Sequence, residues 1–386
     1  MVPEQVANRF CRLEPIGSGN MADVYRAVDL QAAEGSPHRV VAVKLIQPKY
    51  LRKISGPLGE SRPVRRIEQE VRNMRQLVAH PNLPHIIAGG VDDAGWAYLA
   101  MEFLDGKDLG KLMDERIRLP IGWVAALGAQ IANGLAAAHA VRVIHRDLKP
   151  TNVMLTRGGA VKVLDFGVAR IIDDDKDGSR LTRTGFPLGS DGYMAPEQFR
   201  GAKQATQAAD LYSLGCTLFA LLTGAQPFEE GSTRELEEQH RRETVPPVRQ
   251  LRSDTPTELV RLIEALLAKD PSNRPADAVT VRETLLRFAA DEDPIPGWEE
   301  FDPVRWLLDT RQAGVSGRRP AYPPPPPPPP RRMPGRAWTC SGCTRSSSTT
   351  TGSSPAAALS SGMNESPPSS RKTSKPSPSG PIPGCR

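Results

Sequence analysis

The residues with the most chemical potential lie in one block, VIHRDLKPTNV, at residues 143–153. Burying a histidine, two cations, a carboxylate and an amide between apolar flanks is costly unless those groups are used. Asp147 can accept or orient a hydroxyl proton, and Lys149 can neutralise charge moving onto a phosphoryl group. Asn152 can bind a hard cation through its carbonyl oxygen. These residue types point to chemistry at a phosphate rather than to a structural polar loop.

A second block, VKVLDFG at residues 161–167, completes this set. Its first four residues alternate as a strand and deliver Asp165, a second oxygen ligand for a metal ion. Mg²⁺ keeps several waters and is commonly bound through one or two carboxylates together with substrate phosphates. Asp165 and Asn152 meet that demand, so we expect Mg²⁺ as the metal, with Mn²⁺ as a possible substitute.

Two features nearer the N-terminus fit a nucleotide. The run GSGNMADV at residues 17–24 could close over phosphates without interference from Cβ atoms, although turns alone explain most G-x-G pairs and Ala22 occupies the third glycine position. Val24 would cover one face of a base. Lys44 ends the apolar run VAVK and could reach the α- and β-phosphates, or could be an edge lysine with its head group in solvent.

A lysine in that role needs a carboxylate to hold it, and the helical pattern at residues 64–78 supplies one. Glu70 has Met74 and Leu77 at its i+4 and i+7 positions, so it faces inward. Glu68 is turned away by about 200° and is expected in solvent.

The elements that must position these groups fall into two sets. Short apolar runs at residues 40–46 and 96–103 predict strands, whereas segments near 122–140, 206–223, 256–268 and 276–288 have helical periodicity. We therefore predict an α+β fold, with a small β-rich lobe that contains one key helix and a larger, mainly helical lobe. A cleft between two lobes is a common place for a small ligand.

Composition separates a folded part from a tail. The chain has 386 residues, 38 of them proline, and a net charge of +6. From Thr310 onward there are eleven Lys or Arg residues and one acid, so the remainder of the chain carries −4. We predict a folded domain at 8–290, divided near residue 104, a docked segment at 291–309, and a disordered, basic tail at 310–386.

Some classes of protein are disfavoured. The basic pI describes the tail, so we expect no nucleic-acid partner. The uncharged stretch 119–141 contains glycines and polar residues in a helical pattern, which predicts a core helix and no membrane span. Five scattered cysteines and no N-terminal signal favour a reduced, cytoplasmic setting. Cys340 and Cys343 have zinc-ligand spacing without a second pair nearby.

In their order and spacing, the glycine-rich loop, VAVK, HRDLKPTN, DFG and APE, the last at residues 195–197, resemble the eukaryotic-like Ser/Thr protein kinase family, and its bacterial members in particular. The resemblance covers about residues 8–290. It implies the two-lobed protein kinase fold, ATP and Mg²⁺ as cofactors, and protein substrates with Ser or Thr acceptors. It also implies that Asp147, Lys149, Lys44 and Glu70 are catalytic.

The resemblance extends to further positions. Met101 would be the gatekeeper, the backbones of Glu102 and Leu104 would bind adenine, and Asp108 would contact the ribose unless it only caps a helix. Glu197 should pair with Arg274, and Asp210 should brace the catalytic loop. The implied ATP-binding set, with Asn152 and Asp165 also on the metal, is Ile16, Gly17, Ser18, Gly19, Val24, Ala42, Lys44, Met101, Glu102, Leu104, Asp108, Asn152, Leu155 and Asp165.

The segment between DFG and APE carries the expected regulation. Thr182 and Thr184 stand where bacterial relatives are autophosphorylated, with Ser179 a weaker candidate, and Arg146 could bind the added phosphate. The alternative is that they are ordinary loop residues. Lys149 indicates Ser/Thr acceptors. Val168 favours threonine, whereas Ser190, where the family often has Thr, loosens that preference.

Two other readings of the whole chain remain: a catalytically silent pseudokinase or signalling scaffold, and a small-molecule kinase of related fold. Pseudokinases usually lack the lysine or one of the two aspartates, and all three are present here. Trans-autophosphorylation would need a transient kinase dimer. The eight prolines at 323–330 could bind an aromatic-lined groove on a partner or could be a plain linker.

Overall fold

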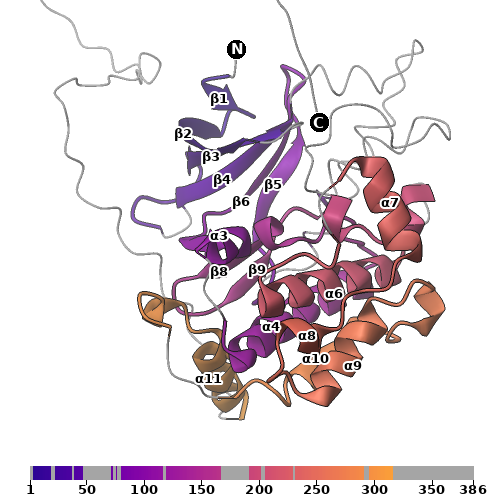
Figure 1. Ribbon diagram of the computed structural model, residues 1–386. Helices are drawn as coiled ribbons and strands as arrows, with labels where there is room; N and C mark the ends of the chain where they lie inside the picture. The colour runs from indigo at the N-terminus through magenta and orange to yellow at the C-terminus, as the bar shows by residue number, and fades with distance from the viewer. Residues whose placement is uncertain are drawn as a thin grey trace, which may run out of the picture. The chain divides into compact units, whose positions relative to one another are not determined.

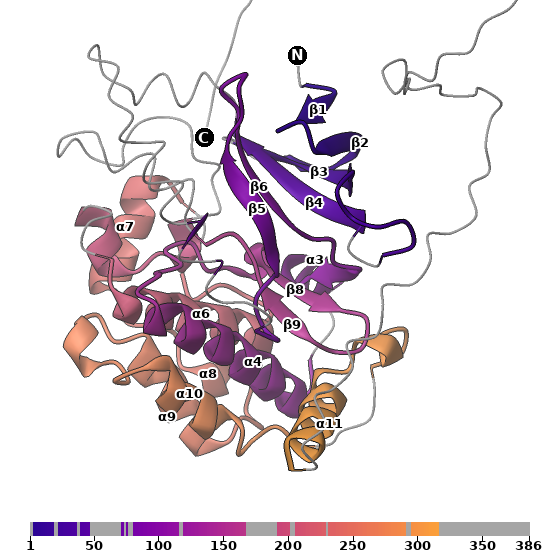
Figure 2. The ribbon, with the colours of Figure 1, turned by 180° about the vertical axis from the view of Figure 1, so that it is seen from behind.

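The computed structural model describes residues 3–18, 22–36, 39–46, 71–72, 75, 80–115, 119–166, 191–200, 205–228, 231–290 and 295–315. These residues form a β-rich N-terminal part and a helical C-terminal part (Figures 1 and 2). The predicted α+β fold class is therefore confirmed. The helix expected at 64–78, which carries Glu70, lies outside the described residues apart from Val71, Arg72 and Arg75.

The N-terminal part is an antiparallel sheet in the order β1-β2-β3-β4-β6-β5. Its strands are β1 (Gln5–Val6), β2 (Phe10–Ser18), β3 (Ala22–Asp29), β4 (Val40–Ile46), β5 (Ile86–Val91) and β6 (Ala97–Glu102). A second antiparallel sheet contains β7 (Gly106–Asp108), β8 (Val153–Thr156) and β9 (Val161–Val163). Strand β9 is the strand predicted to deliver Asp165.

The alternation of side chains along β4 decides which face of the large sheet meets the ligand. Val41, Val43 and Leu45 are buried in a cluster with Phe10 and Tyr25. Successive residues of a strand point to opposite faces, so Ala42, Lys44 and Ile46 share the other face. Ala42 and Ile46 join the main core of the protein on that side. Lys44 is thereby directed toward the helical part.

The helical part is built on two apolar helices, α4 (Ile121–Ala140) and α6 (Gln207–Thr223). The others are α3 (Leu109–Asp114), α7 (Thr233–Arg242), α8 (Val248–Leu251), α9 (Thr257–Leu266), α10 (Ala278–Leu285) and α11 (Pro303–Val315). Among the described residues, α4 is the one helix long and apolar enough to cross a membrane, but 78% of that stretch is buried. The prediction of a core helix here is confirmed.

The sequence analysis missed α7, which begins with a capping box: the Ser232 side chain accepts from the Glu235 backbone N–H, and the Glu235 side chain accepts from the Ser232 N–H. Near the end of this helix, His240 is fully buried, and its Nδ1 lies 2.9 Å from the Tyr212 hydroxyl. Phe228 packs edge-on against the imidazole. Burial lowers the pKa of His240 to about 3.

This histidine makes the fold acid-sensitive. Below pH 6.5 the unfolded chain takes up a proton at His240 that the folded chain does not, so the free energy of unfolding falls as the pH falls. The contribution is about 1.4 kcal/mol per pH unit between pH 6.5 and 4. We expect His240→Gln, which can keep the bond to Tyr212, to lose stability less steeply over that range. Urea unfolding at several pH values measures the difference, and parallel curves for the two proteins would contradict it.

Candidate active site

A buried carboxylate on α6 fixes the backbone at the start of the predicted catalytic loop, which lies within the block at residues 143–153. Asp210 is 1% exposed, and its two oxygens accept from the N–H groups of His145 and Arg146, both at 2.8 Å. His139 of α4 contacts the same carboxylate, with Nε2 at 2.8 Å from Oδ2. Arg146 has a φ of 66°, a left-handed conformation that costs energy in a non-glycine residue. The predicted brace by Asp210 is confirmed.

His145 links this loop to the strand that ends at Asp165. Its imidazole is fully buried, and burial lowers its pKa, so the ring is neutral. Nε2 then donates to the carbonyl of Leu164 at 2.6 Å, while Nδ1 accepts from the Asp147 N–H at 3.3 Å. The ring also packs on Phe166, with centroids 4.7 Å apart. His145 thus links the backbone at Asp147 to the backbone just before Asp165.

Three predicted side chains meet directly. The Asn152 amide nitrogen donates to the Asp147 carbonyl at 2.7 Å and to its Oδ2 at 3.0 Å. Lys149 Nζ lies 3.3 Å from the same Oδ2. Because the nitrogen of Asn152 is engaged with Asp147, its side-chain oxygen is the atom left to bind a cation.

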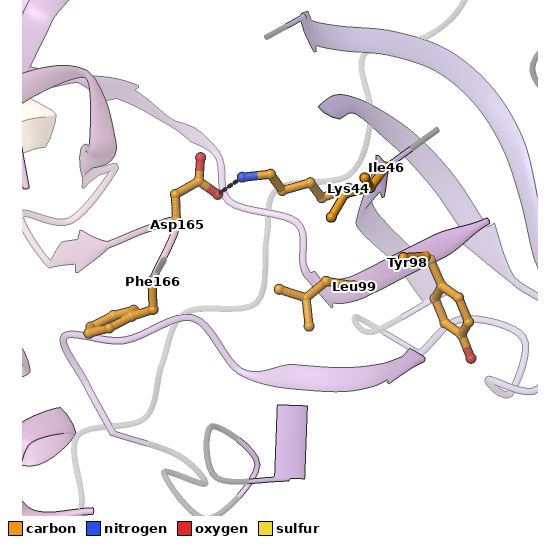
Figure 3. Close-up of a pocket in the computed structure, with 7 residues that line it drawn as sticks. Lys44, Ile46, Tyr98, Leu99, Asp165 and Phe166 are labelled. Carbon is orange, nitrogen blue, oxygen red and sulfur yellow. Dashed lines mark ion pairs between the residues drawn. The ribbon is translucent and has the colours of Figure 1, made fainter. Parts of the chain in front are cut away.

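Lys44 crosses from the sheet to Asp165, with Nζ 2.9 Å from Oδ1 (Figure 3). Burial raises the pKa of Asp165, but the interactions with Lys44, His145 and Lys149 together outweigh burial, and the net pKa lies below its ordinary value. Leu99 points toward the same space, whereas the Tyr98 ring points away from the pair. The small pocket here is lined by Lys44, Ile46, Ala97, Tyr98, Leu99, Asp165 and Phe166.

The expected metal ligands suit a hard divalent cation. Asp165 is an ionised carboxylate with a φ of 60°, and Asn152 offers a carbonyl oxygen. Oxygen donors of these two kinds are what Mg²⁺ and Mn²⁺ prefer. No cluster of three or more His, Cys, Asp or Glu residues occurs among the described residues.

Register places the expected nucleotide residues in rows across the large sheet. Gly17 pairs with Val24, and Val24 pairs with Lys44 on the next strand. Ala42 pairs with Met101 on β6. Ile16 is 45% exposed beside this row, and Leu155 is buried on β8. These residues therefore line neighbouring strands, although Gly19 lies outside the described residues.

Asp108 has the structural role that was weighed against ribose binding. Its Oδ1 accepts from the Lys111 backbone N–H at 3.0 Å and caps α3, and its Oδ2 lies 3.3 Å from Lys111 Nζ. A ribose hydroxyl would have to share this carboxylate with the cap.

Glu102, the last residue of β6, connects this strand to β9, the strand before Asp165. Lys162, 3% exposed on β9, donates to Glu102 Oε1 at 2.6 Å and to the Leu83 carbonyl at 3.0 Å. The same oxygen accepts from the His85 N–H at 3.0 Å. Burial lowers the pKa of Lys162. The sequence analysis missed this contact, although a lysine inside an apolar strand was a signal for it.

The APE block is tied to the same loop. Glu197 and Arg274 form the predicted two-point ion pair, at 2.6 and 2.9 Å, and the Arg274 side chain is fully buried. Gln198, which the sequence analysis also missed, donates to the Arg146 carbonyl at 2.9 Å and accepts from the Ala195 N–H at 3.1 Å. The bond from Gln198 to the Arg146 carbonyl ties residues 195–198 to the catalytic loop.

Several expectations concern residues outside the described part of the chain. They are Glu70, Gly19, Val168, Ser179, Thr182, Thr184, Ser190 and residues 316–386 of the predicted tail. The first residues of that tail, 310–315, were predicted to be disordered but belong to helix α11.

Comparisons with known proteins give a consistent family. The sequence model of the protein kinase domain family matches residues 10–285. The chain is 37% identical over 276 residues to Serine/threonine-protein kinase pkn3 of Myxococcus xanthus, across 70% of this chain and 48% of the relative. It is 32% identical over 327 residues to Serine/threonine-protein kinase PknB of Mycolicibacterium smegmatis, across 83% and 48%. The chain thus spans about half the length of these two relatives.

The ion pair of the APE block gives a stability prediction. Arg274→Ala leaves Glu197 largely buried without its cation, and breaking a buried pair in this way costs about 3–5 kcal/mol. The matched control is Arg242→Ala, because Arg242 pairs with Glu238 at 3.0 Å but is 71% exposed. Removing an exposed pair of that kind costs less than about 1 kcal/mol. Chemical denaturation measures both variants, and equal losses would show that Arg274 does not stabilise the fold in this way.

Proposed function

The chain belongs to the protein kinase domain family, and on this premise we propose that it transfers the γ-phosphoryl group of ATP to serine or threonine hydroxyls of proteins. The observation that carries the proposal is the convergence of Asp147, Lys149 and Asn152, together with the contact between Asp165 and Lys44. The lysine and the two aspartates that pseudokinases usually lose are all in place. The relatives' names describe serine/threonine-protein kinases.

Each side chain has a definite task in this reaction. Asp147 orients the acceptor hydroxyl and accepts its proton as the new O–P bond forms and the bond to ADP breaks. Lys149 Nζ, 3.3 Å from the Asp147 carboxylate, balances charge on the γ-phosphoryl oxygens. Asn152 and Asp165 would hold Mg²⁺ or Mn²⁺, which neutralises charge on the β- and γ-phosphates.

Lys44 would exchange partners when nucleotide binds. Its Nζ contacts Asp165, which is also the proposed metal ligand. With Asp165 holding the metal ion, Lys44 would leave that carboxylate and contact the α- and β-phosphates of ATP. Glu70 is the proposed second partner of the lysine, as in the family template.

The adenine would meet the backbone that follows β6. The Glu102 N–H already donates to the His85 carbonyl at 2.9 Å, so the contribution of Glu102 is its carbonyl oxygen. The Leu104 N–H supplies the complementary donor. Ile16, Val24, Ala42 and Leu155 provide the apolar walls, and Met101 is the gatekeeper.

Regulation and setting complete the proposal. We infer that Thr182 and Thr184 are autophosphorylated, in trans within a transient dimer. A polyproline-binding partner for residues 323–330 is a further proposal. Because the reaction consumes ATP, we place the catalytic domain in the cytoplasm.

The test of phosphotransfer uses the catalytic aspartate. We expect Asp147→Asn to lower kcat for a generic protein acceptor by about 10²–10⁴-fold, because the hydroxyl loses its proton acceptor. Asp93→Asn, on the exposed turn between β5 and β6, is the control and should keep full activity. Transfer from γ-labelled ATP with Mg²⁺ measures the rates. Near-normal turnover in Asp147→Asn would refute the assignment.

Autophosphorylation has its own readout. After incubation with Mg²⁺ and ATP, phosphopeptide mass spectrometry should find phosphate on Thr182 or Thr184 in the unaltered chain and not in Asp147→Asn. Phosphate on Ser179 alone, or equal phosphate in both proteins, would contradict self-priming at the two threonines.

A further inference from the structure

The chain continues past the matched kinase domain into a C-terminal segment, residues 295–315, that packs on the catalytic part. Ile295, Trp298, Phe301 and Val304 are each at most 8% exposed and belong to the main core. Helix α11 packs against α4, and the orange segment before it lies near β8 and β9 (Figures 1 and 2). Gln130 of α4 donates to the Pro303 carbonyl at 3.2 Å. This segment is therefore an integral part of the folded unit.

On one side, the segment holds Lys107, which lies between the proposed adenine and ribose contacts. Lys107 Nζ is 4.0 Å from the centroid of the Trp298 ring and 3.2 Å from Glu115 Oε1. The Trp298 indole N–H donates to Glu115 Oε2 at 2.8 Å. The Trp298 and Lys107 hydrogen bonds together lower the pKa of Glu115. Lys107, just before α3, and Glu115, just after it, therefore contact each other and both contact Trp298.

On the other side, the segment reaches Asp105 through an arginine. Arg157, in the turn between β8 and β9, donates to Asp105 Oδ2 at 3.1 Å and pairs with Glu300. The Glu300 carbonyl accepts from the Gly158 N–H at 2.5 Å. The guanidinium also lies 5.5 Å from the Phe301 ring centroid, and Phe301 packs on Trp298.

A glycine in the turn between β8 and β9 lies close to the backbone of the C-terminal segment. Gly159 has a φ of +83°, and a Cβ there would lie 1.9 Å from the Asp302 carbonyl oxygen. The turn thus admits the backbone of the C-terminal segment at a distance that no other residue type allows.

We propose that Trp298 and its neighbours Glu300 and Phe301 are positioning residues for the nucleotide. They fix the stretch 104–108, which carries Leu104 and Asp108, by holding the side chains at 105 and 107. A stretch that is already ordered loses less conformational freedom when ATP binds, so the affinity rises. This inference rests on the nucleotide site of the proposed function.

The experiment separates positioning from simple stability. Lys107→Met keeps the aliphatic stem and removes the cation, and Trp298→Leu keeps apolar bulk and removes the ring and the indole N–H. Calorimetric titration with Mg²⁺ and adenylyl-imidodiphosphate, a non-hydrolysable ATP analogue, measures affinity without requiring turnover. We expect each variant to bind about threefold to fivefold more weakly, the range for a partly exposed cation–π contact.

A double variant tests the coupling. If Trp298 acts through Lys107, the pair of substitutions weakens binding no more than the stronger single one. With saturating ATP, kcat should stay within about twofold of the unaltered chain while KM for ATP rises. Val281→Ala is the stability control, because Val281 is fully buried on α10, which packs against α4 and α9.

The outcomes are distinct. An unchanged analogue affinity in Lys107→Met and Trp298→Leu, with a lowered Tm like that of Val281→Ala, would overturn the inference and leave the segment with a structural role only. Analogue binding without phosphotransfer in the unaltered chain would overturn the proposed function, while the affinities would still decide the role of Trp298. No analogue binding at all would overturn both.

Discussion

The active site depends on one constraint: a carboxylate buried on α6 accepts hydrogen bonds from two successive backbone N–H groups of the catalytic loop. Asp210 is nearly inaccessible to water, so its charge must be compensated locally by the His145 and Arg146 N–H groups and by His139. Two adjacent N–H groups can point at one carboxylate only if the backbone turns sharply, and Arg146 adopts the left-handed conformation that allows it. The direction of the loop after residue 146 follows from that turn.

Hydrogen bonds from this loop then fix the positions of the other groups of the site. His145 orients Leu164 and Asp147, and Gln198 clamps the Arg146 carbonyl. The strand before Asp165 is fixed a second time, where Lys162 contacts Glu102 beside the backbone proposed to bind adenine. The proposed metal ligands, the proposed catalytic carboxylate and the strand expected to bind nucleotide are thus connected through hydrogen bonds, which suits a reaction that relies on positioning and electrostatics.

Much of the site could be predicted from sequence because its chemistry is local. Asp147, Lys149 and Asn152 lie within six residues, and the run VAVK already marked Lys44 as a lysine that could reach phosphates. The contacts that were missed join residues far apart in the chain. Gln198 and its partner are separated by 52 positions, Lys162 and Glu102 by 60, and Trp298 and Glu115 by 183. The periodicity of apolar residues along the sequence does not indicate which distant residues contact each other. Asp108 shows the opposite difficulty, since a helix cap and a ribose contact need the same residue type.

The most direct measurement is the turnover of Asp210→Asn in the full chain, with a protein acceptor and with nucleotide affinity measured in parallel. The amide can accept from only one of the two N–H groups, so the loop after residue 146 loses its fixed direction. Since a misplacement of about 1 Å can cost 10²-fold in rate, we expect kcat to fall by about 100-fold or more while nucleotide affinity changes less than about twofold. A folded Asp210→Asn protein with kcat within about twofold of the unaltered chain would contradict the central role given to this carboxylate.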